Sequence, residues 1–509
     1  LGTPFHAGMV MRFARLFFLC VASISTYASQ LPQIDGLSNK SDQAKQLMSE
    51  GKFQQAVVLY RELNKAVPNN PGLKLNLGMA LHLAGKKREA IPELEEAVKL
   101  DPHMAPAWLF LGTTRLQLGE ASAALKPLRT VLQLRPDQHE ARQMLADALF
   151  SLDRLEEART EYQRIATEDS QNAPAWYGLG RCYELLSSTT FEKLQRLAPE
   201  SGYVISLLAE ARLREQQFSS AFYLYRRALE RMPNLHGLHS AVAEIYRQTG
   251  HPEWAETEEQ REMAPALLDC RSPTLECQFK AGNYEDLIAA AEPAKTPESF
   301  YWRTRAYNEL ALTAFDRLGR LPPSAELHEL KAQIYSNQKK YSEAASEWRK
   351  ASELSPANLQ IRKELAISLK LGEDYSAALP LFQELLDQQP DSAEFNYFAG
   401  DTLLDLQQPK EALPLLKRAV ARDPNSIAAQ KSLARCELAA GHAANAIPHL
   451  KLVLARDEDG TLHYQLAQAY RAIGQIELSK KMLSDYESMQ RSIAARNEAA
   501  KQETDITAP

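Results

Sequence analysis

The residues best suited to chemistry lie in one stretch of the sequence, between positions 236 and 280. His236 and His239 are three positions apart, which would place both imidazoles on one face of a helix. A zinc site needs three or four ligands and no third one is nearby in sequence, so we expect no metal there. The catalytic alternative is an enzyme that uses His239, Cys270 or Glu276, the obvious titratable side chains of this stretch.

Four of the five cysteines lie beyond residue 29. Cys270 and Cys277 would be about 10 Å apart on one straight helix, which is too far for a disulfide. Pro273 lies between them and disfavours a single helix, so the chain could fold back at this point. The sequence therefore leaves both a disulfide and two free thiols open. Cys182 and Cys436 occupy positions that hold small residues elsewhere, and we expect buried thiols there.

Motifs for nucleophilic, nucleotide-dependent or metal-dependent catalysis are missing from the sequence. It contains no Gly-x-Ser-x-Gly, no Gly-x-x-x-x-Gly-Lys-Ser/Thr, no Gly-x-Gly-x-x-Gly and no His-Glu-x-x-His. The acidic turn at 457–460 does not match an EF-hand loop, because the glycine of that loop is its sixth residue. We therefore expect no catalytic residues, no cofactor and no metal.

Composition and charge narrow the class of protein. Hydrophobic residues make up 45% and charged residues 24%, which is typical of a folded chain. The 59 basic and 65 acidic residues give a net charge of −6, which argues against nucleic acid as a partner. A length of 509 residues exceeds what one compact core usually holds, so several domains or one extended array is expected.

Residues 1–29 have the pattern of a secretory signal peptide. Two arginines precede an apolar run at 16–24 that is too short to span a bilayer, and small residues follow near Ala28. No other apolar run approaches eighteen residues, so we expect no stable membrane span. The pattern predicts a periplasmic or secreted protein in which a linker, 30–36, leads into the folded chain.

Most of the remaining sequence repeats with a period of 34 residues. Ten segments carry Gly or Ala at the eighth position and Ala at the twentieth, and seven of them carry Pro at the thirty-second. They start at residues 37, 71, 105, 139, 202, 236, 325, 359, 393 and 427. Apolar residues three and four apart predict two amphipathic helices per segment. The small residues let the two helices approach closely, and the Pro ends the second one. Stacked pairs would then share one continuous core.

These positions resemble the tetratricopeptide repeat family, as at Trp108, Leu111-Gly112, Ala124 and Pro136. The resemblance covers about residues 37–490 and implies an all-α protein, an α-solenoid in which helix-turn-helix units form a right-handed superhelix. Two departures from the period predict two blocks of repeats. The expected parts are a first block at 37–269 with a short irregular unit at 173–201, an irregular helical module at 270–324, a second block at 325–490 with capping helices, and a polar tail at 491–509. In the short unit the second helix is expected at 191–197, and in the irregular module a long helix is expected at about 299–318.

The resemblance also implies a binding face. In this family the second, fifth, ninth and twelfth residues of the first helices line a concave groove. In the first block the matching candidates are Leu75, Met79, His82, Leu109, Thr113, Leu116, Phe150 and Tyr177. In the second block they are Glu329, Gln333, Lys363, Lys370, Asp401, Lys431 and Arg435. The first set is mostly apolar and the second is charged. The alternative is that some of these side chains pack against the neighbouring unit.

The sequence thus predicts a non-catalytic scaffold of exported bacterial type that binds protein or peptide segments in the groove. The alternative is a subunit of a cell-envelope assembly or polysaccharide-export complex, which many exported proteins of this kind resemble. An enzyme with a site near 236–280 is the third candidate, and the oligomeric state stays open.

Overall fold

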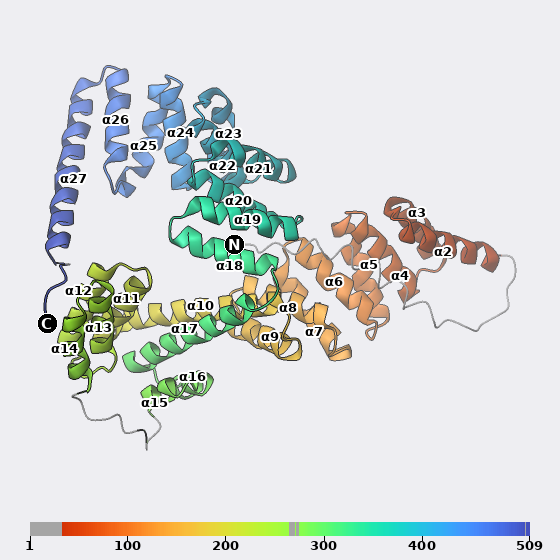
Figure 1. The fold of residues 1–509 in the computed structure, drawn as a ribbon. Coiled ribbons are helices and arrows are strands. Elements are labelled where there is room, and N and C mark those ends of the chain that lie inside the picture. The colour runs from red at the N-terminus through yellow and green to blue at the C-terminus, as the bar shows by residue number, and fades with distance from the viewer. Residues whose placement is uncertain (1–32, 264–269, 271–273, 504) are drawn as a thin grey trace. The chain divides into compact units, whose positions relative to one another are not determined.

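The computed structural model describes residues 33–263, 270, 274–503 and 505–509. In these residues the protein is all-α, with 26 α-helices named α2 to α27 and no strand (Figure 1). This confirms the fold class predicted from the repeat. The predicted signal peptide at 1–29 lies outside the described residues.

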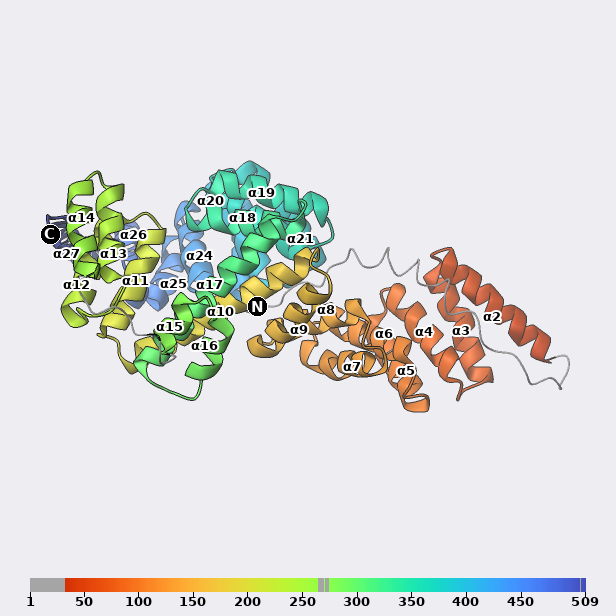
Figure 2. The ribbon, with the colours of Figure 1, turned by 60° about the horizontal axis from the view of Figure 1, so that its bottom comes forward.

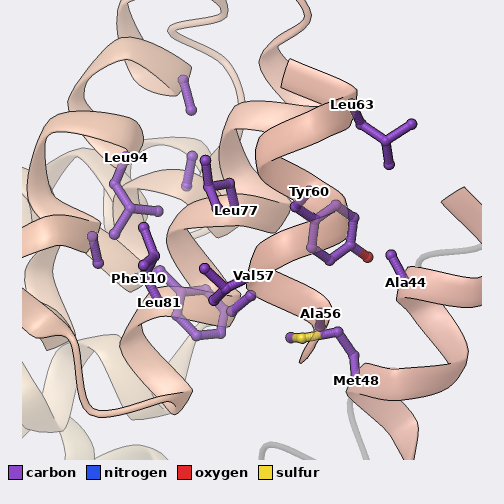
Figure 3. Close-up of a cluster of buried hydrophobic side chains, with 14 of the residues drawn as sticks. Ala44, Met48, Ala56, Val57, Tyr60, Leu63, Leu77, Leu81, Leu94 and Phe110 are labelled. Atoms are coloured by element: carbon purple, nitrogen blue, oxygen red, sulfur yellow. The ribbon is translucent and has the colours of Figure 1, made fainter. Parts of the chain in front are cut away.

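The first eight helices pack in order as pairs. They are α2 (Gln33–Ser49), α3 (Phe53–Ala66), α4 (Pro71–Leu83), α5 (Lys87–Leu100), α6 (Ala105–Gln117), α7 (Ala121–Leu134), α8 (His139–Ser151) and α9 (Leu155–Glu168). Each second helix also contacts the first helix of the next pair, so the pairs share one core. Figure 3 shows part of it, where Tyr60, Leu77 and Leu81 meet between the helices.

The small residues of the period lie where two helices of a pair touch. A Cβ atom added to Gly78 would lie 2.6 Å from the side chain of Leu94, and one added to Gly112 would lie 2.9 Å from Leu128. A larger residue at either glycine would push the two helices apart.

The turn between the helices of a pair has one conformation in both blocks. Its residue at the fifteenth position has a positive φ, whether it is a glycine such as Gly85 (78°) or another residue such as Asp153 (56°) and Gln407 (61°). Glycine adopts this left-handed conformation without strain, and other residues adopt it only where the flanking helices impose it.

A single helix replaces the short unit expected at 173–201. The sequence predicted a second helix at 191–197, but α10 runs without a break over Ala173–Leu197. This prediction was wrong. No Gly or Pro occurs between Gly180 and Pro199, so nothing in this part of the chain ends the helix.

The first half of α10 pairs with α17 (Pro297–Gly319), which lies much later in the chain. In an ordinary unit the glycine of the first helix packs against the second helix of the same pair, as Gly78 does against Leu94. The corresponding residue of α10, Gly180, packs instead against the ring of Phe315 in α17.

Polar contacts of α17 with α10 and with the neighbouring α9 support the same pairing. The Ser187 hydroxyl donates a hydrogen bond of 2.7 Å to the Asn308 side-chain oxygen, although the residues are 121 positions apart. The Tyr307 side chain is 1% exposed, and its hydroxyl donates to the Glu156 carboxylate of α9 at 2.8 Å. The repeat unit that begins at 173 is therefore discontinuous, with six helices between its two halves.

The helices between these halves include two further regular pairs. The six are α11 (Gly202–Arg214), α12 (Phe218–Arg231), α13 (Leu238–Gln248), α14 (Pro252–Met263), α15 (Leu275–Lys280) and α16 (Tyr284–Ala291). α11 pairs with α12, α13 pairs with α14, and the short α15 packs on α16. The long helix expected at 299–318 is observed as α17, which lies within the segment 270–324 predicted to be an irregular helical module.

Regular pairs resume after α17. They are α18 (Ala325–Asn337), α19 (Tyr341–Leu354), α20 (Leu359–Leu371), α21 (Tyr375–Gln388), α22 (Ala393–Asp405), α23 (Pro409–Arg422), α24 (Ile427–Ala439), α25 (Ala443–Val453), α26 (Thr461–Ala472) and α27 (Ile476–Glu503), with a short 3₁₀ turn at Leu454–Arg456. α27 continues through most of the expected polar tail, because residues 491–503 are rich in Ala, Glu, Lys, Arg and Gln, which favour helix.

Two compact units make up the chain. One comprises residues up to Thr189 together with 304–330 and 351–360, and the other comprises 190–303, 331–350 and 361–509. The dividing points fall inside α10, α17, α18, α19 and α20, and the contacts of the discontinuous repeat, such as that between Gly180 and Phe315, lie within the first unit.

Candidate interaction face

The first helices of successive pairs contact one another, α4 with α6 and α6 with α8, and so form one face of the first block. Five of the predicted binding residues on this face are half-buried and apolar. They are Leu75, Met79, Leu109, Leu116 and Phe150, which we call the apolar strip. Part of each side chain is open to solvent, and those of Leu75 and Met79 also pack against the buried core beneath them.

His82 lies in the packed contact between α4 and α6, not on the open part of the face. The Thr114 hydroxyl donates to the Phe110 carbonyl at 2.6 Å, so it accepts from His82 Nδ1 at 2.8 Å. The His82 ring is 7% exposed and meets the Phe110 ring edge-on. Burial, aided by the charge of Lys87, lowers the pKa of His82 to about 4.

Two more candidates are packed against neighbouring helices. Thr113 is buried, donates to the Leu109 carbonyl at 2.9 Å and lies 3.5 Å from the Met144 sulfur in α8. Tyr177 of α10 packs against the cluster that contains Leu318 of α17. The alternative kept open in the sequence, packing against the next unit, therefore applies to His82, Thr113 and Tyr177.

In the second block, candidates on three successive first helices meet in a charged cluster. Lys370 of α20 contacts Asp401 at 2.8 Å and Asp405 at 2.5 Å, both on α22. Arg435 of α24 contacts the same two carboxylates at 2.9 and 2.8 Å, and the Ser432 hydroxyl donates to Asp401 at 2.6 Å. We call these five residues the ion-pair ladder.

The ion-pair ladder is balanced within itself, with two cations and two carboxylates. Burial would by itself lower the pKa of Lys370, but the carboxylates of Asp401 and Asp405 outweigh it, and the pKa is raised. Lys363 is paired as well, with Glu394 at 3.1 Å. Lys363, Lys370 and Arg435 were all predicted as binding residues, yet their charges are matched inside the protein. The cluster therefore orders the three helices and offers little net charge to a ligand.

The sequence singled out Lys370, Asp401 and Arg435 but missed Asp405 and Ser432. Asp405 follows Asp401 by four residues, which places both carboxylates on one face of α22. That spacing was the available signal. No comparable signal marks Ser432, because a serine on a helix is compatible with many surroundings.

Removing Asp401 should weaken the second block. In Asp401→Ala, Lys370 and Arg435 share one carboxylate and the Ser432 hydroxyl loses its acceptor, so we expect a loss of about 1–2 kcal/mol in the free energy of unfolding. Glu394→Ala is the matched control, because it removes an exposed partner of Lys363 and should cost less than about 1 kcal/mol. Urea unfolding followed by circular dichroism measures both, and equal costs would show that the ladder has no special role.

The candidate catalytic residues near 236–280 lie in separate contacts. His239 bonds to the buried Glu258 at 2.5 Å, while His236 contacts Glu276 at 2.9 Å. Cys270 and Cys277 form a disulfide with an S–S distance of 2.11 Å and a Cα–Cα distance of 5.6 Å, so of the two alternatives left open by the sequence the disulfide is observed. Within the described part of the chain, no three His, Cys, Asp or Glu side chains are grouped so that they could hold a metal ion. The same part contains no helix that is long and apolar enough to cross a bilayer.

Comparison with known proteins agrees with this architecture. Family models described as tetratricopeptide repeats match residues 41–105, 84–139, 115–182, 325–358 and 369–436. The protein is a tetratricopeptide-repeat protein. Repeats of this kind are typical scaffolds for protein–protein interaction, and their stacked helices present extended surfaces to partners.

Three other proteins are similar to parts of this tetratricopeptide-repeat protein. The BBSome complex member BBS4 of Bos taurus is 23% identical over 274 residues, 46% of this chain and 51% of BBS4. Superkiller complex protein 3 of Mus musculus is 33% identical over 103 residues, 20% of this chain and 7% of the relative. This chain thus spans half of one relative and a small part of the other. The crystal structure of a tetratricopeptide repeat protein from Parabacteroides merdae has 14% identity and a TM-score of 0.32, and covers 66% of this chain and 99% of its own.

Proposed function

We propose that this protein is a non-catalytic scaffold that binds an apolar protein segment on the apolar strip of α4, α6 and α8. The observation that carries the proposal is the contrast between the two blocks. Five apolar side chains are partly open on the face of the first block, whereas Lys363, Lys370, Asp401 and Arg435 of the second block are in ion pairs.

The chemistry of the strip suits a segment with regularly spaced apolar residues. Met79 of α4, Leu109 of α6 and Phe150 of α8 lie on successive first helices, so a ligand that crosses these helices could contact each one in turn. The flexible Met79 side chain adapts to different partner shapes. An amphipathic helix or an extended segment with alternating apolar residues fits such a surface, because either places a row of apolar side chains on one side.

We further propose that the protein is exported and works in the periplasm or outside the cell. The basic, apolar and small residues near the amino terminus support this, as does the disulfide between Cys270 and Cys277, because disulfides persist in oxidising compartments. A role as a subunit of a cell-envelope assembly or polysaccharide-export complex is the alternative within the same proposal.

The apolar strip can be tested with a displayed library of random 16-residue peptides selected against the full chain. We expect the selected peptides to share apolar residues at helical or alternating spacing. Met79→Glu combined with Leu109→Glu should weaken their binding at least about tenfold, because each glutamate must lose water when an apolar side chain covers it. Binding is measured by fluorescence anisotropy.

The control for this experiment is Val58→Glu, on a 55% exposed side chain of the second helix α3. It should leave binding unchanged. A library that gives no shared pattern, or peptides that bind the double variant as well as the original protein, would contradict the proposal.

A further inference from the structure

The segment 505–509, which follows α27, contacts a helix far away in the sequence. The Tyr246 hydroxyl of α13 donates a hydrogen bond of 2.7 Å to the main-chain carbonyl of Thr507. Both residues belong to the same compact unit, and the carboxyl-terminal end of the chain lies beside α13 and α14 in both views (Figures 1 and 2). Ile506, next to the bonded residue, is half-buried, whereas its neighbours in the segment are exposed.

The tyrosine that makes this bond is held rigidly. Its side chain is 0% exposed, and its ring meets those of Phe222 and Trp254 at centroid distances of 5.5 Å each. A fixed hydroxyl that donates to a main-chain carbonyl recognises the backbone of a segment without regular secondary structure and not any one side chain.

Charges of both signs lie around this hydroxyl, and one of the cations has no ion-pair partner among the described residues. The guanidinium groups of Arg226 and Arg261 and the carboxylate of Glu258 all lie close enough to act on Tyr246 electrostatically. Arg261 is paired with Glu258 at 2.5 Å, but Arg226, exposed on α12, makes no ion pair with any described residue. The bound segment carries a carboxylate two residues before Thr507, at Asp505.

We propose that α12, α13 and α14 form a second docking site, that this site takes an extended segment in which an acidic residue precedes an aliphatic one, and that residues 505–509 of this chain occupy it. Tyr246 binds the segment backbone, Arg226 attracts the acidic residue over a distance longer than that of an ion pair, and the aliphatic side chain loses part of its contact with water. The site is independent of the apolar strip, which belongs to the other compact unit.

While residues 505–509 of the same chain occupy the site, they block it to other ligands. A segment tethered to the same chain competes at an effective concentration on the order of millimolar, so an external peptide of the same chemistry binds only if it has higher affinity or if the segment is displaced. The proposal therefore includes regulation, since whatever withdraws residues 505–509 opens the site.

The test uses a fluorescein-labelled synthetic peptide of residues 501–509 and two forms of the protein, the full chain and a chain ending at Glu503. The shortened chain should bind the peptide saturably in fluorescence anisotropy, and the full chain should bind it at least about tenfold more weakly. An Ile506→Asp version of the peptide should bind about tenfold more weakly to the shortened chain, because it cannot bury an aliphatic side chain.

Two variants of the shortened chain locate the site. Tyr246→Phe keeps the ring in the core and removes only the hydroxyl, so it should weaken binding about fivefold. Arg226→Ala should weaken binding and reduce its dependence on salt, whereas Arg231→Ala, an exposed arginine of the same helix, should do neither. Circular dichroism confirms that each variant is folded.

Three results would overturn the proposal. They are the absence of saturable binding to the shortened chain, equal affinity of the full and shortened chains, and an unchanged affinity in Tyr246→Phe. None of them bears on the apolar strip, whose own test uses other peptides and other variants.

Discussion

Replacing Tyr307 with alanine should destabilise the first compact unit by about 3–5 kcal/mol, the range found when a fully buried aromatic side chain is removed. The Tyr307 side chain of α17 is 1% exposed, lies with its ring 6.3 Å from that of Tyr183 in α10, and bonds to Glu156 of α9. In the discontinuous unit it therefore joins a helix late in the chain to two helices much earlier in it. If α17 did not complete that unit, the stability of α9 and α10 would not depend on Tyr307.

Hydrogen exchange read by mass spectrometry is the measurement for this prediction, because it assigns the loss of stability to particular helices. Tyr307→Ala should speed exchange in α9 and α10 as well as in α17. Tyr307→Phe, which loses only the hydrogen bond to Glu156, should cost about 1 kcal/mol. Leu312→Ala changes a 51% exposed residue of the same helix and should have no measurable effect. Faster exchange confined to α17 would refute the shared unit.

His82 should make the first block sensitive to acid. Its pKa is about 4 in the folded protein and near 6.5 when unfolded, so the unfolded chain binds the proton more readily. The part of the unfolding free energy that depends on a neutral His82 is fully present above about pH 6.5. It is lost as the pH falls toward 4. The difference between the two pKa values corresponds to about 3 kcal/mol of unfolding free energy at 1.36 kcal/mol per unit.

The comparison with His82→Asn isolates this effect from the titration of other groups. Asparagine can still donate to Thr114 but does not take up a proton, so the variant should lose less stability between pH 7 and pH 4 than the original protein does. Urea unfolding at a series of pH values measures the difference. His103→Asn replaces an exposed histidine near α6 and should leave the pH dependence unchanged. Parallel pH curves for His82→Asn and the original protein would show that His82 is not the responsive group.

Most of the fold could be predicted from the sequence, because each regular pair is specified within its own 34 residues. Ala56 and Gly78 mark helix contacts through small size alone, and the glycine at 85 marks a left-handed turn. The pairing of α10 with α17 could not be predicted in this way. The contact that creates it, between Gly180 and Phe315, joins residues far apart in the chain, and the period is interrupted between them.

The positions of the candidate binding residues on the first helices could be predicted, but the exposure of their side chains to solvent could not. The family pattern places His82 and Leu116 at the same site of their units, yet His82 is buried against Thr114 and Leu116 is partly open. Whether such a side chain reaches solvent depends on the size and polarity of the residue facing it from the next unit. The pairing of Lys370 with Asp401 has the same origin, since two helices must stack before their charges can meet.

The central claim, that the protein binds partners on the apolar strip, is tested most directly by hydrogen exchange of the full chain with and without a peptide selected on it. We expect added protection in α4, α6 and α8, with none in α20, α22 and α24, whose charges are already paired. Protection confined to α20, α22 and α24, or its absence from α4, α6 and α8 at saturating peptide, would contradict the claim.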